Sequence, residues 1–497
     1  MHRLAAAPAR GVRVLAMLAL LAAATPAPTR ADCADLLRAL RGRVVDATCV
    51  ASPDLTTANP DTTPANNALP TVPPFAFTPV TDRAVIAPAA PLRTPIAAAV
   101  PGWQLDGWVA EELPDGQPRQ SRFLLRVPAE WNGRLVVAGA SGTRSEFNGD
   151  YAWSDYVVQK GYAYASQNKG ILNLYLSTAA DPLACRLNPA SPVFVHFYDD
   201  DPGKPFTEWA PAMIGAAGLA RDALVAHAHR PPRHTYAVGT SNGGYQVRRA
   251  VELAPQLFDG GVDWEGTFVD PGAPNLLTDL PAAILNWPDY VASGFDPNST
   301  AAENIRAAGY PPDLVAGSTS LWGLYWAAFW EVTQCQWQKR LDPTYDTYGA
   351  GTGLYHYVAR LSVSDVGAQL AAFATTGAIQ RPLVTVAGTM DALLPIDHHA
   401  RAYARKVAAA QADLAPGQAR RAPYRLYEIQ NGNHIETYQA TFPQLEIIEP
   451  HAQRAFDLLV DHVEKGAALP PSQCVPRGGA IEASPVRRGH CAGLLAP

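Results

Sequence analysis

The sequence lacks the features that mark several common functional classes. Acidic residues outnumber basic residues by 45 to 39, so the chain has no excess of positive charge with which to bind nucleic acid. Its cysteines and histidines form no Cys-x-x-Cys or His-Glu-x-x-His pattern, and no motif for an organic cofactor is present. We therefore expect no nucleic-acid partner, no metal and no cofactor.

No apolar run beyond the N-terminus reaches the length that spans a bilayer. The first 31 residues are instead typical of a secretory signal peptide, because three arginines precede a short apolar stretch at 14–24 and small residues near Ala31 suit cleavage. A buried N-terminal helix is the alternative. The sequence predicts a secreted or periplasmic protein without a membrane span after cleavage.

Cysteine is scarce but even in number, with six residues in the whole chain. In an exported protein an even number favours disulfides over free thiols, although six cysteines allow 15 connectivities. Proximity in sequence favours two local pairs, Cys33 with Cys49 and Cys474 with Cys491. Cys185 and Cys335 would then form the long-range pair.

Composition divides the chain after residue 31 into five segments. A cysteine-bounded segment with a Pro/Thr-rich linker covers 32–79, and a tail with a disulfide covers 467–497. Short apolar runs alternate with helical patterns over 80–270 and again over 381–466, as in a mostly parallel sheet flanked by helices. Residues 271–380 break this rhythm and are rich in Pro, Trp and Tyr, which indicates an inserted lid domain.

Residues 239–243 read Gly-Thr-Ser-Asn-Gly and fit the Gly-x-Ser-x-Gly pattern of a nucleophile elbow. An apolar run at 235–238 precedes the motif, and apolar residues at helical spacing follow it until Pro255. A glycine-rich turn without chemistry is the alternative, but the flanking strand and helix patterns favour the elbow. We predict that Ser241 is a nucleophile and that the amide of Asn242 donates to the oxyanion.

Two later loops offer the acid and the base that such a serine requires. Asp391 follows a strand pattern at 383–387, and His434 follows the next strand pattern at 424–429. The order Ser, Asp, His is that of α/β-hydrolases, in which each residue follows a strand. The sequence therefore predicts an α/β fold of the α/β-hydrolase type, with a mostly parallel sheet flanked by helices and an inserted lid domain.

Other residues compete for the roles of acid and oxyanion donor. Asp397 lies close to Asp391 in sequence, and Asp263 or Glu265 is the fallback acid because both lie near the end of another strand pattern. The second oxyanion donor should come from the loop after the strand pattern at 135–138, and we favour the amide of Ser141.

Aromatic and acidic clusters elsewhere have two interpretations each. Trp322, Trp326 and Trp330 recur every four residues within the predicted lid, which indicates core packing first and an aromatic wall for substrate second. Tyr325 would extend such a wall. Residues 198–201, Tyr-Asp-Asp-Asp, suit a solvated acidic loop better than a calcium site.

Three short segments resemble the tannase and feruloyl esterase family: Cys-Ala-Asp-Leu-Leu at 33–37, Pro-Ala-Glu-Trp-Asn-Gly-Arg at 128–134 and Gly-Tyr-Ala-Tyr-Ala at 161–165. The resemblance implies ester hydrolysis by a lidded α/β-hydrolase. That family links a cysteine before its serine to one after its histidine, whereas this chain has Thr240 and Ile435 there. Galloyl or feruloyl specificity is therefore in doubt.

The Ser-Asn-Gly-Gly sequence at 241–244 is similar to that of bacterial hydroxyalkanoate oligomer hydrolases. We therefore predict a secreted serine esterase that acts through an acyl-enzyme on an aryl ester or a hydroxyalkanoate oligomer. The alternatives are a secreted serine exopeptidase and a non-catalytic binding protein on the same fold. The sequence does not indicate an oligomeric state.

Overall fold

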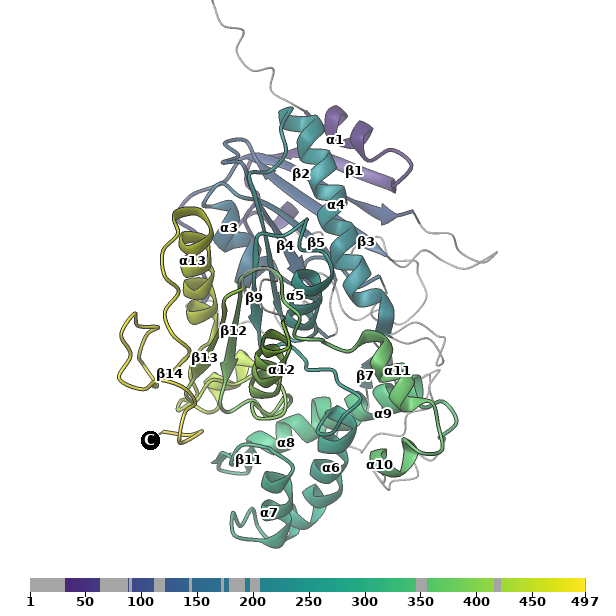
Figure 1. Ribbon diagram of the computed structural model, residues 1–497, viewed down its shortest axis with the longest axis vertical. Coiled ribbons are helices and arrows are strands. Elements are labelled where there is room, and N and C mark those ends of the chain that lie inside the picture. Colours follow the sequence, from purple (N-terminus) through teal and green to yellow (C-terminus); the bar gives the residue numbers. More distant parts are fainter. Residues whose placement is uncertain are drawn as a thin grey trace, which may run out of the picture. The chain divides into compact units, whose positions relative to one another are not determined.

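The structure is a computed structural model, and the part of the chain that it describes comprises residues 32–62, 88, 92–110, 121–142, 145–170, 174–177, 193–196, 206–345, 355–414 and 422–496 (Figure 1). Residues 32–497 form one compact unit. The predicted signal peptide, most of the predicted linker, Cys185 and the acidic segment 198–201 lie outside the described residues.

A sheet of ten strands forms the centre of this unit. In spatial order the strands are β1 (Val44–Ser52), β2 (Gly102–Val109), β3 (Arg122–Pro128), β5 (Ala163–Gln167), β4 (Arg134–Gly139), β8 (His234–Thr240), β9 (Gly260–Trp264), β12 (Leu383–Gly388), β13 (Tyr424–Ile429) and β14 (Gln473–Val475). From β5 to β14 all neighbours pair in parallel, whereas β1, β2 and β3 pair antiparallel. The prediction of a mostly parallel sheet is confirmed.

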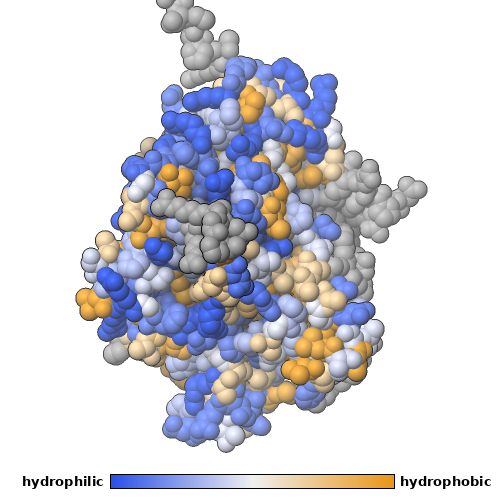
Figure 2. All heavy atoms as spheres, in the orientation of Figure 1, coloured by the Kyte–Doolittle hydropathy of each residue, from blue (hydrophilic) through white to orange (hydrophobic). Residues whose placement is uncertain are grey.

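Both faces of the sheet are buried, as a parallel sheet requires. Successive strand residues point to opposite faces, so Leu135 and Val137 pack on one side while Val136 and Ala138 pack on the other. The first side is covered by α4 (Trp209–Ala228), α5 (Asn242–Leu253) and α12 (Ala400–Ala412), and the second by α3 (Asp155–Val158) and α13 (Glu449–Lys465) (Figure 1). Figure 2 shows a mostly hydrophilic face, with hydrophobic residues in separate groups.

An additional helical segment enters between two neighbouring strands. β9 and β12 pair directly although many residues separate them, so the chain between them is an insertion into the sheet domain. Its elements are α6 (Leu276–Ala292), α7 (Thr300–Ala307), β10 (Val315–Ala316), β11 (Thr319–Ser320), α8 (Leu321–Tyr325), the π-helical turn η6 (Trp326–Trp330), α9 (Glu331–Leu341), α10 (Tyr357–Arg360) and α11 (Val366–Phe373). We call this segment the insertion; its buried apolar side chains form one cluster with residues of the sheet domain, among them Trp209, Tyr245 and Ile435.

The two predicted local disulfides are both present. Cys33–Cys49 ties α1 (Cys33–Ala39) to β1, and Cys474–Cys491 ties β14 to the C-terminal residues. Cys335 is also disulfide-bonded, while its predicted partner lies outside the described residues. The remaining described strands, β6 (Leu174–Ser177) and β7 (Val193–His196), form a separate antiparallel pair. Among the described residues, no helix is both long and apolar enough to cross a membrane.

Candidate active site

Ser241 lies in a sharp turn between β8 and α5. Its φ of 59° and ψ of −122° form a backbone conformation that non-glycine residues rarely adopt, and such strain is frequent at functional sites. A Cβ atom at Gly239 would lie 2.4 Å from the Gly243 carbonyl oxygen, and one at Gly243 would lie 2.5 Å from that of Gly139. The motif glycines are therefore required by close backbone packing, and the predicted strand, turn and helix around Ser241 are confirmed.

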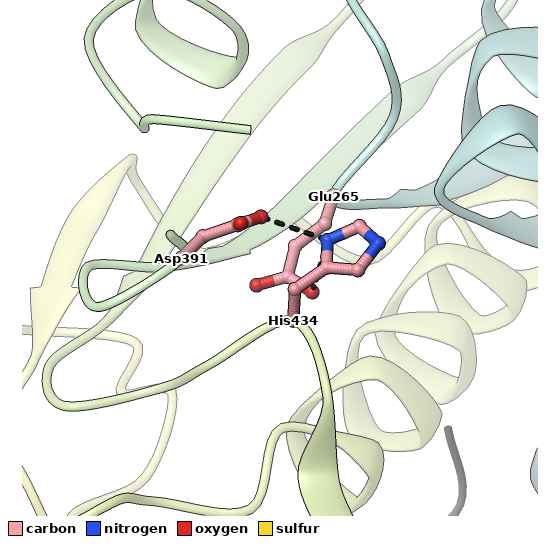
Figure 3. A group of neighbouring side chains, drawn as sticks. All are labelled: Glu265, Asp391 and His434. Carbon is pink, nitrogen blue, oxygen red and sulfur yellow. Dashed lines mark hydrogen bonds and ion pairs between the residues drawn. The ribbon is translucent and has the colours of Figure 1, made fainter. Parts of the chain in front are cut away.

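His434 and Asp391 are in direct contact at the carboxyl ends of β13 and β12. His434 Nδ1 lies 2.8 Å from Asp391 Oδ2, and both side chains are buried. The other oxygen of Asp391 accepts hydrogen bonds from the amides of Leu393 at 2.8 Å and Leu394 at 2.7 Å. Figure 3 shows the second ring nitrogen, Nε2, pointing away from Asp391. The Nδ1 atom of the imidazole therefore contacts the Asp391 carboxylate, while Nε2 points away from it.

A second carboxyl group, Glu265, lies beside the same imidazole (Figure 3). It follows β9 with a φ of 49°, accepts a hydrogen bond from the amide of Gly388 at 2.9 Å, and has Oε2 at 3.6 Å from His434 Nδ1. Burial and the negative charge of Asp391 raise the pKa of Glu265 to about 8, although the nearby imidazole opposes the shift. Glu265 is therefore mainly protonated at neutral pH.

The other two competing acids are engaged elsewhere. Asp263 is fully buried, receives Arg248 Nε at 2.6 Å and the Thr385 hydroxyl at 2.8 Å, and so serves as the partner of a buried cation. The Asp397 side chain is 52% exposed and pairs with Arg401 at 3.1 Å. Of the fallback acids that sequence suggested, the structure brings Glu265 alone to His434.

The predicted oxyanion donors differ in how they are bonded. Asn242 is the first residue of α5, where helical amides lack partners within the helix. The amide and hydroxyl of Ser141 both donate to Asn148 Oδ1, at 3.2 and 2.8 Å. A Cβ atom at the next residue, Gly142, would lie 3.9 Å from Asn242 Nδ2. Because the Ser141 amide already has an acceptor, the Gly142 amide is the better candidate for the second donor.

Lys169 contacts the loop of the predicted oxyanion donors and was not found by sequence reasoning. Its buried ammonium group donates to the carbonyl oxygens of Ser141, at 2.8 Å, and of Gly142. It also lies 4.7 Å from the ring centroid of Trp209. No motif identifies such a lysine, because its contacts are made with residues far away in sequence.

The three predicted lid tryptophans do not share one environment. Trp322 and Trp330 are fully buried in the hydrophobic cluster that the insertion shares with the sheet domain, as the packing interpretation predicts. Trp326 is only partly buried and packs against Trp287. The π-helical turn at 326–330 changes the spacing that an α-helix would give. Trp326 thus stays a candidate for substrate contact.

Glu265, Asp391 and His434 also have the residue types of a metal site, since one ligand atom from each lies within 4.8 Å of the others. Binding a cation there would require an ionised Glu265 and a deprotonated Nδ1. The raised pKa of Glu265 favours a proton on its carboxyl group, and the 2.8 Å contact of Nδ1 with Asp391 favours a proton on Nδ1. Both protons oppose the binding of a cation. We keep the prediction of a metal-free site.

Comparison with known families shows a similarity in the second half of the chain. Residues 354–491 match the family model described as 3HB-oligomer hydrolase, a segment that contains Asp391 and His434 but not Ser241. A D-(-)-3-hydroxybutyrate oligomer hydrolase of Burkholderia thailandensis is 34% identical over 128 residues, which cover 24% of this chain and 17% of that protein. One from Burkholderia mallei is 34% identical over 112 residues, covering 21% and 15%. The matched part is less than a fifth of each relative.

Solved structures share the fold at low sequence identity. Feruloyl esterase B from Aspergillus oryzae has a TM-score of 0.52 and 13% identity, covering 86% of this chain and 88% of that one. Tannin acyl hydrolase from Aspergillus niger has a TM-score of 0.41 and 14% identity, covering 82% and 89%. The first similarity, together with the sheet topology, confirms the predicted α/β-hydrolase fold. The chain therefore resembles 3HB-oligomer hydrolases in sequence over residues 354–491 and a feruloyl esterase in fold.

Proposed function

We propose that this protein is a serine hydrolase that cleaves carboxylic esters, with Ser241 as nucleophile, His434 as general base and Asp391 as its partner. The observation that carries the proposal is the contact of His434 Nδ1 with Asp391 at the sheet edge where the strained Ser241 turn also lies. Catalysis by a serine requires a nearby base, because its hydroxyl is a weak nucleophile until a base removes the proton, and a histidine held by a carboxylate meets this need.

The proposed reaction proceeds in two halves. Ser241 Oγ attacks the ester carbonyl carbon while His434 Nε2 takes the hydroxyl proton, and Asp391 stabilises the imidazolium that forms. The amides of Asn242 and Gly142 donate to the oxyanion. The alcohol leaves with the proton from His434, and an acyl-enzyme remains. Water, deprotonated by His434, then attacks the acyl group, which releases the acid and restores Ser241.

For the substrate we propose a short hydroxyalkanoate oligomer, with aryl esters as the alternative. The match of residues 354–491 to the 3HB-oligomer hydrolase family favours the oligomer. The likeness to a feruloyl esterase concerns the fold and supplies no comparable sequence match. We further propose that residues 271–380 form a lid and that the protein acts after export, as the N-terminal pattern predicts.

The test compares wild-type mature protein with Ser241→Ala and with a control, Ser362→Ala, in which the replaced serine is exposed. Each protein is treated with a fluorophosphonate probe, the labelled peptide is mapped, and turnover is measured on p-nitrophenyl esters and 3-hydroxybutyrate oligomers. We expect labelling at Ser241 and ester turnover in wild type and control, and neither in Ser241→Ala.

The same experiment separates the rival functions. Faster turnover of aminoacyl p-nitroanilides than of esters would replace the esterase with an exopeptidase. A folded wild-type protein that neither turns over these substrates nor reacts with the probe would overturn the triad and favour a binding protein on the hydrolase fold.

A further inference from the structure

A widened turn interrupts one long helix of the insertion. The chain is helical from α8 through η6 into α9, and η6 is π-helical over Trp326–Trp330. In a regular α-helix, side chains five positions apart point roughly 140° away from each other, because the helix has 3.6 residues per turn. One extra residue in a turn brings such a pair toward the same face. Tyr325 and Trp330, at the two sides of this turn, are five residues apart.

Tyr325 reaches the loop that carries the base. Its hydroxyl donates to Asn433 Oδ1 at 2.8 Å, and Asn433 directly precedes His434. The same oxygen accepts the amide of Ile435 at 3.1 Å, on the other side of His434. Tyr325 and Asn433 are both buried, so neither group can replace this hydrogen bond with one to bulk water.

Trp330 reaches the loop that carries the acid. Its indole Nε1 donates to the carbonyl oxygen of Ala392 at 2.7 Å, and Ala392 directly follows Asp391. Both residues are fully buried. One helix of the insertion therefore donates two hydrogen bonds to neighbours of the acid–base pair. One goes to the side chain of Asn433, next to His434, and the other to the backbone of Ala392, next to Asp391.

The acid and base loops are also bonded to each other. Asn433 Nδ2 donates to the Met390 carbonyl oxygen at 2.5 Å, and the Met390 amide donates to the Gly432 carbonyl oxygen at 2.7 Å. Tyr325 and Trp330 add one hydrogen bond from the insertion to each of these loops. Asn433 is the residue that the two loops and the insertion share.

We infer that Tyr325 and Trp330 are positioning residues which, from the π-helical turn, hold the acid and base loops at the separation that the Asp391–His434 contact needs. This inference rests on the proposed function, because it assigns a catalytic purpose to that contact. The two side chains act through Asn433 and Ala392. The insertion would then belong to the catalytic apparatus.

The expected effect is large because catalytic geometry has little tolerance. A displacement of about 1 Å can lower a rate by roughly 10²-fold even when its cause is remote from the chemistry. Loss of either hydrogen bond should therefore lower kcat more than it changes KM, since substrate contacts stay intact.

The insertion offers matched controls for both substitutions. Tyr290 donates its hydroxyl to Asp313 Oδ2 at 3.1 Å, and Trp322 donates its indole to the Pro311 carbonyl oxygen at 3.0 Å. Both are buried, and their acceptors belong to the insertion itself. Tyr290→Phe and Trp322→Phe thus remove the same kinds of bond as Tyr325→Phe and Trp330→Phe, without touching either loop.

The experiment measures kcat, KM and thermal unfolding of the four variants and of wild type on one p-nitrophenyl ester. We expect kcat to fall about 10- to 100-fold in Tyr325→Phe and Trp330→Phe, and less than about threefold in the controls, at similar unfolding temperatures. Equal losses in variants and controls, or unchanged kcat in the variants, would overturn the inference.

An activity-independent measurement keeps this inference separable from the proposed function. Proton NMR of the His434 Nδ1–H should give a signal in wild type and controls, and faster exchange with water should broaden it in Tyr325→Phe and Trp330→Phe. The same signal in all five proteins would overturn the positioning role even if esters are turned over. If the protein does not hydrolyse esters but the signal still broadens in Tyr325→Phe and Trp330→Phe, the positioning role is retained and the proposed function fails.

Discussion

The loops after β9 and β12 each bring a carboxyl group to the same imidazole, and their surroundings differ. Asp391 accepts two backbone amides at one oxygen and His434 at the other, whereas Glu265 accepts one amide and lies farther from the ring. Hydrogen-bond donors stabilise a carboxylate, while burial beside another negative charge destabilises it. Burial and the neighbouring charge of Asp391 raise the pKa of Glu265, and its single amide donor does not offset them.

The largest expected effect comes from replacing Asp391, the proposed partner of the base. Asp391→Asn keeps the size of the side chain but removes the charge that stabilises the imidazolium and selects its tautomer, and we expect kcat to fall by about 10⁴-fold. Steady-state kinetics on a p-nitrophenyl ester measures this. Asp397→Asn, on the same loop but exposed, should stay within about twofold of wild type. A greater loss in Glu265→Gln than in Asp391→Asn would reverse the two roles.

A smaller loss should follow from crowding the place where the two loops meet. A Cβ atom at Gly388 would lie 2.3 Å from the Gly432 carbonyl oxygen and 2.8 Å from Glu265 Oε1. Gly388→Ala should therefore destabilise the fold by about 1–3 kcal/mol and lower kcat. Gly215 in α4 has open space around its Cα, so Gly215→Ala should raise stability by up to about 1 kcal/mol instead. Denaturant unfolding of both variants checks the contrast.

Glu265→Gln should have little effect on the rate at neutral pH. An amide, like the protonated carboxyl group, is uncharged and can still accept the Gly388 hydrogen bond. We expect kcat/KM within about threefold of wild type at pH 6–7. Above pH 8 the wild type should exceed the variant, because ionised Glu265 adds a charge that stabilises the imidazolium. Superimposable pH–rate profiles up to pH 10 would contradict this role.

Glu265 should also make the stability of the protein depend on pH. Because the pKa of Glu265 is raised to about 8 in the folded state, the folded protein holds a proton there that the unfolded chain releases above about 4.5. Stability from this group is therefore lost as pH rises from about 4.5 to 8. The stability of Glu265→Gln relative to wild type should increase across that window, as followed by urea unfolding. For Asp155→Asn, whose carboxyl pKa is raised to about 6, the corresponding increase should end earlier.

Much of the site could be predicted because its signals are local. The elbow at Ser241 and the strand patterns before Asp391 and His434 each occupy fewer than about ten consecutive residues, and parallel strands place such loop residues on one edge. The structure has those strands at the expected positions. Glu265 could be named only as a fallback, because its distance from His434 depends on the pairing of β9 with β12 across the insertion.

Other features had no usable signal. The amide of Ser141 was a reasonable donor from its position, but Asn148 accepts its hydrogen bond in the fold. The spacing of Trp322, Trp326 and Trp330 predicts one helical face, and nothing in those residues indicates the π-helical turn that changes it. The contacts of Lys169 with the oxyanion loop are likewise tertiary.

The sequence by itself therefore determined the strands and helices that flank Ser241, Asp391 and His434, the turn at Ser241, the two short disulfides and the candidates for acid and base. These depend on the periodicity of apolar residues and on turns within a few residues. Tertiary structure alone decided that the pKa of Glu265 is raised, that the Ser141 amide donates to Asn148 and how Tyr325 and Trp330 meet the two loops. Those outcomes depend on burial and on hydrogen-bond partners that come from distant parts of the chain, whose combination no local pattern encodes.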